Sequence, residues 1–309
     1  MTFPSRHLTG IETLAASDIL SVLKLAADYR LLLDQTDKNL TDLRHVTVAN
    51  LFFENSTRTR FSFELAERRL GATIINFTNE SSSITKGETV LDTIRNLEVM
   101  KIDMMVLRHT ISGICHLLGR SVSASIINAG EGTHEHPTQA LLDALSIQQH
   151  FNDFRGLQVG IIGDILHSRV ARSLIFTLVK LGSSVHLIGP RTLVPEAFGK
   201  LGARIHYQLD PILPELDVTV SLRIQLERME SGYLPSLIEF HKEYGIDERR
   251  ISRMKSHAIL MHPGPVNRGV EMSHFAVDCG KSIILDQVTN GVAVRMAVLK
   301  MIDAYRKSL

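Results

Sequence analysis

The sequence lacks the features of a secreted or membrane-spanning protein. Only two of its 309 residues are cysteines, Cys115 and Cys279, and their spacing suits neither a metal site nor a redox pair. Disulfide bonds are therefore not expected, and a reducing compartment fits. The amino-terminal residues form no apolar signal core, and no run approaches the roughly 20 apolar residues of a transmembrane helix. We predict a soluble, cytoplasmic protein.

An excess of charge of either sign is also missing. The chain has 34 Lys and Arg against 33 Asp and Glu, which gives a formal net charge of +1. Proteins that bind nucleic acids or membrane surfaces through their overall charge are more strongly basic. We therefore expect no nucleic-acid and no membrane partner, and any anion must be bound by a local cluster.

The glycine-rich loops of nucleotide-binding enzymes are absent as well. Gly160-Ile161-Ile162-Gly163 follows an apolar run, but the third glycine of a dinucleotide-binding fingerprint is missing. A G-x-x-x-x-G-K-[ST] loop does not occur either. A dehydrogenase or a nucleoside triphosphatase is thus disfavoured, and no cofactor is expected.

Apolar runs alternate with helical patterns along the whole chain. This alternation is typical of parallel sheets covered by helices, and the length fits two domains. The fold class that we predict is α/β, with two doubly wound parallel-sheet domains joined by a helix over residues 138–150. Strands are expected at residues 46–53, 73–77, 103–107, 125–128, 157–163, 184–188, 204–207, 218–222 and 258–261.

The strand predicted at 46–53 runs directly into a cluster of hydroxyl and guanidinium groups. A helical pattern begins at that cluster, and Ser56 is suited to be its N-cap. Backbone N–H groups and the positive end of a helix dipole attract anions, and Thr57, Arg58 and Thr59 would add donors. The stretch predicts a phosphate site; a capped surface helix with solvated arginines is the alternative.

Polar residues follow the other predicted strands too. Because ligands of open α/β sheets bind at the carboxyl ends of the strands, these residues are candidates for a binding site. Any one of them is equally well explained as a solvated strand end, so the inference depends on their coincidence. They are Arg108, His136 and Gln139 in the first half, and His167, Ser168, Arg169, Arg223, Gln225, Pro263, Gly264 and Pro265 in the second.

A zinc site and a nucleophilic serine are the remaining alternatives. His134 and His136, with Glu131 and Glu135 nearby, have ligand types that suit zinc. A histidine just before a proline that starts a helix more naturally presents one imidazole to a substrate, so we expect no metal. A nucleophilic serine needs a base beside it, whereas Ser56 is surrounded by arginines.

Several motifs resemble those of the aspartate/ornithine carbamoyltransferase family. They follow the family's order and extend from about residue 8 to residue 305. In the first half they are Phe53-Glu54-Asn55-Ser56-Thr57-Arg58-Thr59-Arg60-Phe61-Ser62-Phe63-Glu64, Lys86-Gly87-Glu88-Thr89 and His136-Pro137-Thr138-Gln139. In the second half they are Leu222-Arg223-Ile224-Gln225 and Met261-His262-Pro263-Gly264-Pro265-Val266-Asn267-Arg268-Gly269.

The second-half motifs resemble the catalytic chains of the aspartate branch. The ornithine branch carries a His-Cys-Leu-Pro motif and a Ser-Met-Gly loop, but the matching stretch at residues 262–265 has no cysteine and the loop sequence is absent. Aspartate also brings two carboxylates that suit guanidinium groups, whereas Arg223 would repel the cationic side chain of ornithine. A carbamoyltransferase for another amine, or a catalytically silent homologue, is the alternative.

The resemblance implies transfer of a carbamoyl group from carbamoyl phosphate to the α-amino group of L-aspartate, an early step of de novo pyrimidine biosynthesis. It implies a carbamoyl phosphate-binding domain over residues 1–136, completed by a C-terminal helix at 291–309. An aspartate-binding domain would cover residues 137–290, with the active site between the two. No metal or cofactor is implied.

The resemblance also assigns roles to individual residues. Catalytic groups would be Arg58, Thr59, Lys86, Arg108 and His136. Carbamoyl phosphate would be bound by Ser56, Thr57, Arg58, Thr59, Arg108, His136, Gln139, Gly264 and Pro265, and aspartate by Lys86, Arg169, Arg223 and Gln225.

Two further implications concern assembly. The family forms homotrimers with shared active sites, in which Ser82 and Lys86 would enter the site of the neighbouring subunit. Glu54 would form an ion pair between the domains, with an arginine such as Arg169, when they close. A regulatory chain or a dihydroorotase is a possible further partner, on which the sequence is silent.

Overall fold

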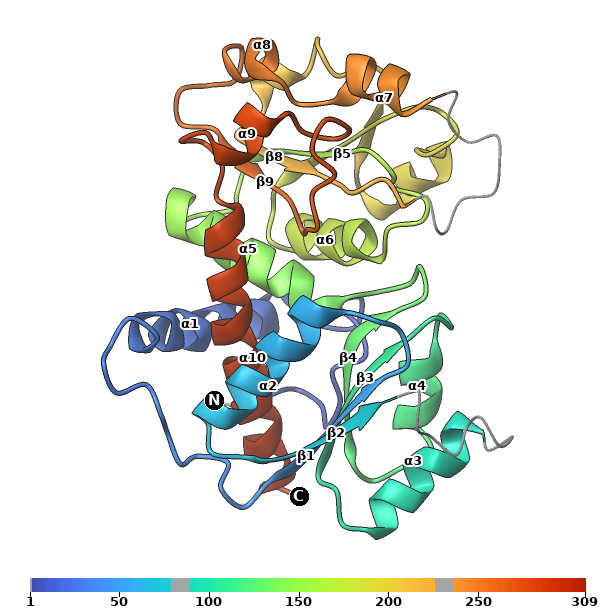
Figure 1. The fold of residues 1–309 in the computed structure, drawn as a ribbon, viewed down its shortest axis with the longest axis vertical. Helices are drawn as coiled ribbons and strands as arrows, with labels where there is room; N and C mark the ends of the chain where they lie inside the picture. The colour runs from blue at the N-terminus through green and yellow to red at the C-terminus, as the bar shows by residue number, and fades with distance from the viewer. Residues whose placement is uncertain (1, 79–88, 226–235) are drawn as a thin grey trace. The chain divides into compact units, whose positions relative to one another are not determined.

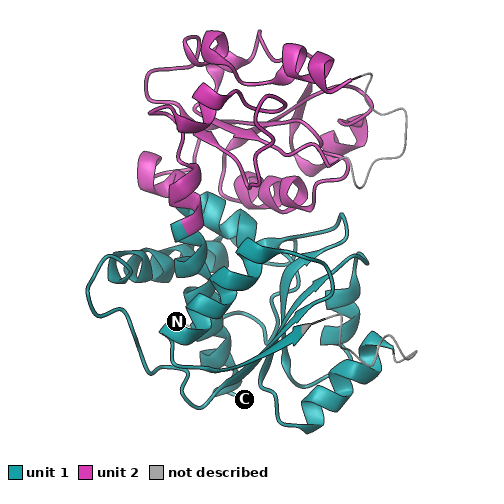
Figure 2. Ribbon diagram, viewed as in Figure 1, with its two compact units in different colours: residues 1–145, 289–309 teal, residues 146–288 magenta. Residues whose placement is uncertain are grey.

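We analysed a computed structural model that describes residues 2–78, 89–225 and 236–309 (Figure 1). The chain forms two compact units (Figure 2). Unit 1 consists of residues 1–145 and 289–309, and unit 2 of residues 146–288. The chain passes from one unit to the other after residues 145 and 288, and both points lie inside helices. The sequence analysis placed these boundaries after residues 136 and 290.

Unit 1 contains a parallel four-stranded sheet in the order β2-β1-β3-β4. β1 and β3 are buried along nearly their whole length, as strands covered on both faces are. Its elements are α1 (Ala16–Leu32), β1 (Thr47–Phe52), α2 (Thr57–Arg69), β2 (Thr73–Thr78), α3 (Val90–Val99), β3 (Met104–His109), α4 (Ile114–Gly119) and β4 (Ser125–Glu131). α5 (Pro137–Phe151) and α10 (Ile284–Arg306) begin or end in this unit.

Helices cover both faces of this sheet (Figure 1). On one face, Ile94 of α3 and Leu118 of α4 pack with Leu51 and Leu107 in a continuous apolar core. α1, α2 and α10 lie on the other side of the sheet. Burial of these apolar side chains is the main force that holds the unit together.

Unit 2 contains a parallel five-stranded sheet in the order β7-β6-β5-β8-β9. Its elements are β5 (Gln158–Ile162), α6 (Arg169–Lys180), β6 (Ser184–Ile188), the 3₁₀ helix η3 (Glu196–Leu201), β7 (Arg204–His206), the 3₁₀ helix η4 (Leu213–Glu215) and β8 (Val218–Ser221). They continue with α7 (Leu237–Tyr244), α8 (Glu248–Ile251), β9 (Ile259–Met261) and α9 (His274–Asp278). The predicted fold class, with two parallel-sheet α/β domains, is confirmed.

Local sequence signals explain where the helices begin. Ser168 caps α6, because its hydroxyl accepts a hydrogen bond from the Ala171 N–H at 3.1 Å. α5 starts with Pro137, whose missing N–H costs nothing at the first position of a helix. Within the described residues, no helix has the length and apolar character that are needed to cross a bilayer.

The last helix is longer than predicted. The sequence analysis placed the C-terminal helix at residues 291–309, but α10 begins at Ile284 and passes through Gly291. A Cβ atom at position 291 would lie 2.5 Å from a guanidinium nitrogen of Arg295 and 3.2 Å from Leu142. Glycine at this position therefore makes room for two packed neighbours, and it does not mark a helix boundary.

Candidate active site

The hydroxyl and guanidinium cluster lies at the start of α2, as predicted. Ser56 is the N-cap residue, but its side chain makes no capping hydrogen bond, and the first turn contains no acidic residue. Thr57 and Arg58 are exposed at this end of the helix. Uncapped N–H groups and the positive end of the helix dipole are thus available to an anion.

Arg108 lies at the carboxyl end of β3, beside this helix start. Phe52 at the end of β1 pairs with Arg108, so the two strand ends are adjacent. The guanidinium group of Arg108 donates to the Glu54 carboxylate at 3.0 Å and to the Ala129 carbonyl at 3.1 Å. Because groups from both neighbouring strands hold it, this largely buried arginine has a fixed position at the centre of the sheet edge.

His136 and Gln139 follow β4 and are also largely buried. The turn before them is fixed by Glu135, whose carboxylate accepts hydrogen bonds from the N–H groups of Ile11 at 2.8 Å and Glu12 at 3.2 Å. The His136 carbonyl accepts a hydrogen bond from the Gln139 N–H at 3.0 Å in the first turn of α5. The chain thus carries polar residues to the same edge of the sheet after β1, β3 and β4.

Two residues behind this edge, Asp143 and Arg295, were missed in the sequence. The side-chain amide of Gln139 donates to the Asp143 carboxylate at 3.0 Å. Arg295 of α10 stacks over the ring of Phe63 in α2, with 4.9 Å between its guanidinium carbon and the ring centroid. The first contact lies within α5, and the second joins α10 to α2. Only the Gln139–Asp143 pair has a helical spacing that a sequence reveals.

Buried cations give this part of unit 1 a positive character. Burial, and then the charge of Arg108, lower the pKa of Arg295 to about 9, while Asp143 opposes the shift. Burial likewise lowers the pKa of His109, the last residue of β3. A site that already concentrates guanidinium groups gains from an anionic ligand.

In unit 2, the first candidate group follows β5. Asp164 is fully buried, and its carboxylate accepts hydrogen bonds from the backbone N–H of His167 at 3.1 Å and lies 2.9 Å from His167 Nδ1. This turn leads to Ser168 and to Arg169, which is the first residue of α6 and is largely buried. Arg169 therefore lies at the carboxyl edge of the unit 2 sheet.

The second group follows β8 and β9. Arg223 and Gln225 come directly after β8, and both are partly buried. After β9, the Gly264 N–H donates to His262 Nδ1 at 2.7 Å, and His262 Nε2 lies 3.2 Å from the Glu271 carboxylate. The buried His262–Glu271 pair, which sequence reasoning did not assign a role, thus fixes the segment that carries Gly264 and Pro265.

The structure therefore brings the predicted residues together in two sets, one in each unit. Ser82 and Lys86 lie outside the described residues. In the structure Glu54 pairs with Arg108. Its pairing with an arginine of the other domain, such as Arg169, stays a prediction. His134 and His136, which the sequence offered together as zinc ligands, point to different surroundings, since the candidate metal cluster of the described residues contains His134 without His136.

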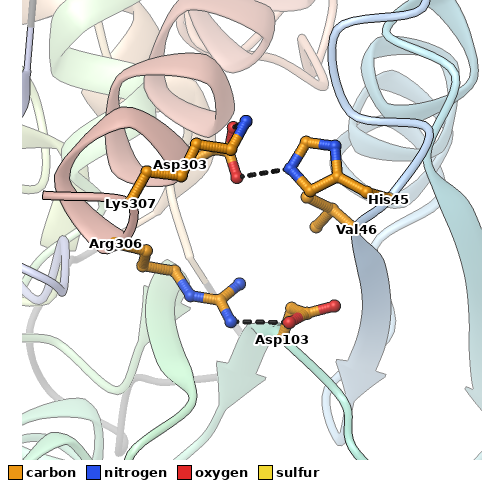
Figure 3. A pocket seen from close by; sticks show the side chains of 6 residues that line it. All are labelled: His45, Val46, Asp103, Asp303, Arg306 and Lys307. Carbon is orange, nitrogen blue, oxygen red and sulfur yellow. Dashed lines mark hydrogen bonds and ion pairs between the residues drawn. The ribbon is translucent and has the colours of Figure 1, made fainter. Parts of the chain in front are cut away.

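A pocket of about 170 Å³ lies at the opposite, amino edge of the unit 1 sheet (Figure 3). Its charged groups neutralise one another: His45 Nε2 lies 3.1 Å from the Asp303 carboxylate, and Arg306 donates to Asp103 at 2.6 Å. Lys307 also contacts Asp303, at 2.8 Å. Because these charges are already paired, the pocket is a weaker candidate for substrate binding than the carboxyl edge.

Both halves of the chain match known domains. Residues 6–149 match the family described as aspartate/ornithine carbamoyltransferase, carbamoyl-P binding domain. Residues 155–302 match aspartate/ornithine carbamoyltransferase, Asp/Orn binding domain. The chain belongs to the aspartate/ornithine carbamoyltransferase family. The resemblance seen in the sequence motifs is confirmed.

Curated relatives carry the name of the aspartate branch. The aspartate carbamoyltransferase catalytic subunit of Cytophaga hutchinsonii is 51% identical over 297 residues, which cover 96% of this chain and 97% of the relative. The corresponding subunit of Granulibacter bethesdensis is 51% identical over 311 residues, covering 100% of this chain and 98% of the relative.

Solved structures of the same enzyme are similar too. Aspartate transcarbamoylase from Trypanosoma cruzi in complex with carbamoyl phosphate and aspartate has a TM-score of 0.86 and 33% sequence identity, covering 96% of both chains. Its complex with N-(phosphonacetyl)-L-aspartic acid also has a TM-score of 0.86 and 33% identity, covering 96% of this chain and 95% of that one.

Proposed function

We propose that the chain transfers the carbamoyl group of carbamoyl phosphate to the α-amino group of L-aspartate, forming N-carbamoyl-L-aspartate and phosphate. The observation that carries this choice is the arginine and glutamine pair directly after β8, Arg223 and Gln225, together with Arg169 at the start of α6. Two guanidinium groups suit an acceptor with two carboxylates, whereas they repel the ammonium side chain of ornithine. The names of the relatives and the ligands of the Trypanosoma cruzi complexes support the same choice.

Carbamoyl phosphate is bound by the edge of unit 1. Ser56, Thr57, Arg58 and Thr59 hold its phosphate at the start of α2, where the helix dipole favours an anion and no acidic side chain competes. Arg108 reaches the same substrate from the end of β3. Gln139, with Gly264 and Pro265, orients the carbamoyl amide.

Aspartate is bound through its two carboxylates. Arg169 binds the α-carboxylate, and Arg223 and Gln225 bind the β-carboxylate. Lys86 of the neighbouring subunit adds a cation. The deprotonated α-amino group then attacks the carbamoyl carbon, so that a C–N bond forms and a tetrahedral oxyanion develops.

Thr59, Arg108 and His136 stabilise this oxyanion. Electrostatic donors that are fixed before the reaction lower a barrier by a few kcal/mol each, and the two hydrogen bonds of Arg108 to Glu54 and Ala129 fix it in this way. The C–O bond to phosphate breaks, and the leaving phosphate takes up the proton of the attacking amine, so that it is released as the hydrogen phosphate dianion. The reaction therefore balances without a dedicated protein base.

The proposal includes a homotrimer with shared sites, in which Ser82 and Lys86 act in the neighbouring subunit. Glu54 takes part in domain closure, and the enzyme works in the cytoplasm at an early step of pyrimidine biosynthesis. The relatives are named catalytic subunits, which fits an assembly that also contains a regulatory chain or a dihydroorotase.

A direct assay tests the function. Purified protein should form N-carbamoyl-aspartate and equimolar phosphate from carbamoyl phosphate and L-aspartate, and L-ornithine in place of aspartate should give no product. Turnover of ornithine without aspartate would assign the chain to the other branch, and turnover of neither, in a protein that still binds phosphate, would make it a silent homologue.

A further inference from the structure

Three potential metal ligands of unit 1 lie close together in space, beside the turn that leads to His136. They are His116 of α4, Glu131 at the end of β4 and His134 in the turn that follows. One ligand atom from each lies within 4.8 Å of the other two. The cluster joins residues that are 18 positions apart in the sequence, and only the close packing of α4 against the end of β4 brings them into contact.

The carboxylate at the centre of the cluster is held in place. Glu131 is fully buried, and one of its oxygens accepts a hydrogen bond from the Cys115 N–H at 2.8 Å. The other oxygen lies 2.7 Å from His134 Nδ1.

The turn from Glu131 to His136 is fixed by backbone hydrogen bonds on both sides. The His134 N–H donates to the Glu131 carbonyl and the Glu131 N–H to the Glu135 carbonyl, both at 3.1 Å. The Thr133 N–H donates to the Ser112 hydroxyl at 3.1 Å. The ligands are therefore positioned by the fold, before any ion binds, and little ordering is needed on binding.

Two imidazoles and one carboxylate form a ligand set that zinc commonly has in proteins. A tetrahedral ion with bonds of ~2.1 Å separates its ligand atoms by about 3.4 Å. In the structure the three ligand atoms lie within 4.8 Å of one another, and the two rings are only partly buried. The Thr9 hydroxyl, 3.1 Å from His116 Nε2, is a group of the kind that orients a ligating histidine.

We propose that His116, Glu131 and His134 bind one divalent metal ion of the zinc class, and that this ion stabilises the turn that leads to His136. The ion has a structural role and takes no part in carbamoyl transfer. The proposal is thus independent of the proposed function, because its readouts are metal binding and thermal stability.

Calorimetric titration of Zn²⁺ into the full chain, after treatment with a chelator, tests the site. We expect one ion per chain with a dissociation constant of about 1 µM or below, and a melting temperature that rises by about 5 °C at a hundredfold excess over that constant. His116→Gln and His134→Gln should each weaken binding by at least about 100-fold. His274→Gln, which changes an exposed histidine of unit 2, is the matched control and should bind Zn²⁺ like the original chain.

A second measurement needs no variant. Co²⁺ added in place of Zn²⁺ should give the intense visible absorption of a site with four or five ligands, and Zn²⁺ should abolish it. The proposal is overturned by the absence of stoichiometric Zn²⁺ binding, by binding that both glutamine variants retain, or by a Co²⁺ spectrum identical to that of the hydrated ion.

Discussion

Gln139 donates its side-chain amide to the Asp143 carboxylate, one turn further along α5, with 3.0 Å between nitrogen and oxygen. Asp143 is fully buried, and its charge also raises the pKa of the buried Arg295, against the larger effects of burial and of Arg108. The carboxylate thus has two roles. It orients the amide that we assign to the carbamoyl group, and it compensates a buried guanidinium group.

Two substitutions of Asp143 separate these roles. Asp143→Asn keeps an oxygen that can accept from Gln139 but removes the charge, whereas Asp143→Ala removes both. Because a buried cation that loses its partner is costly, we expect each variant to lose about 3 kcal/mol of the free energy of unfolding, measured in urea. Only Asp143→Ala should also raise the KM for carbamoyl phosphate, by roughly tenfold, since one hydrogen bond is lost.

Asp153→Asn serves as the control, because this exposed carboxylate of unit 2 pairs with the exposed Arg155 and should change neither quantity by much. An unchanged stability of both Asp143 variants would show that Arg295 does not depend on this carboxylate. An equal rise of KM in both would show that the charge, and not the hydrogen bond, positions Gln139.

The carboxyl ends of the strands were predictable because each is marked by a change from apolar to polar residues. The end of β1 at Phe52 and the end of β8 at Ser221 both lie within two residues of their predicted positions. The sequence therefore indicated where Arg58, Arg108 and Arg223 would lie. It did not indicate Asp143 and Arg295, because their interaction depends on how α10 packs against α5, which no local pattern encodes.

Two features escaped the sequence analysis for the same reason. The C-terminal helix was expected to begin at residue 291, but α10 begins at Ile284, and Gly291 packs inside it against Arg295 and Leu142. His134 was weighed with His136 as a metal pair, which the sequence disfavoured; in the structure, the residues of ligand type beside it are Glu131 and His116 of α4. In both cases a contact between distant segments decides what the residue does.

The start of α2 carries a prediction about phosphate binding. Arg58→Ala should abolish binding of inorganic phosphate and of carbamoyl phosphate, because the anion loses a charge-assisted donor at an otherwise uncapped helix end. Arg60→Ala is a matched control in the same helix; its guanidinium carbon lies 5.6 Å from the centroid of the Phe61 ring, and we expect affinity within about threefold of the original. Calorimetry measures both, and retained phosphate affinity in Arg58→Ala would mean that α2 is only a surface helix with solvated arginines.

The proposed sharing of sites between subunits predicts complementation between two inactive variants. Arg58→Ala and Lys86→Ala should each be inactive, but mixed trimers contain some sites with neither substitution if Lys86 acts in the neighbouring subunit. Dissociating and reassembling a mixture of the two should restore activity, up to about a quarter of the original in randomly mixed trimers. No recovery in trimers whose mixing is verified by mass would place each site within a single chain.

Glu67 gives the stability of unit 1 a pH dependence. This fully buried residue of α2 accepts a hydrogen bond from the Asn50 side chain at 2.8 Å. Burial raises the pKa of Glu67 from 4.5 to about 8; the nearby Glu64 adds to the shift, and the Asn50 hydrogen bond opposes it. The folded protein therefore retains a proton that the unfolded chain releases above about pH 4.5, so this residue's contribution to stability falls as the pH rises from about 4.5 to 8.

Glu67→Gln should remove that dependence, since a glutamine side chain keeps a similar shape and an oxygen for Asn50 but does not ionise. We expect the free energy of unfolding of the variant, relative to the original, to increase between pH 5 and pH 8.5 by on the order of 4 kcal/mol. Glu64→Gln, in the same helix, loses a surface ion pair with Arg68 and the smaller part that Glu64 has in the Glu67 shift, so it should show a much smaller increase. Urea unfolding at the two pH values measures the difference, and a difference that does not change with pH would mean that Glu67 is already ionised in the folded protein at pH 5.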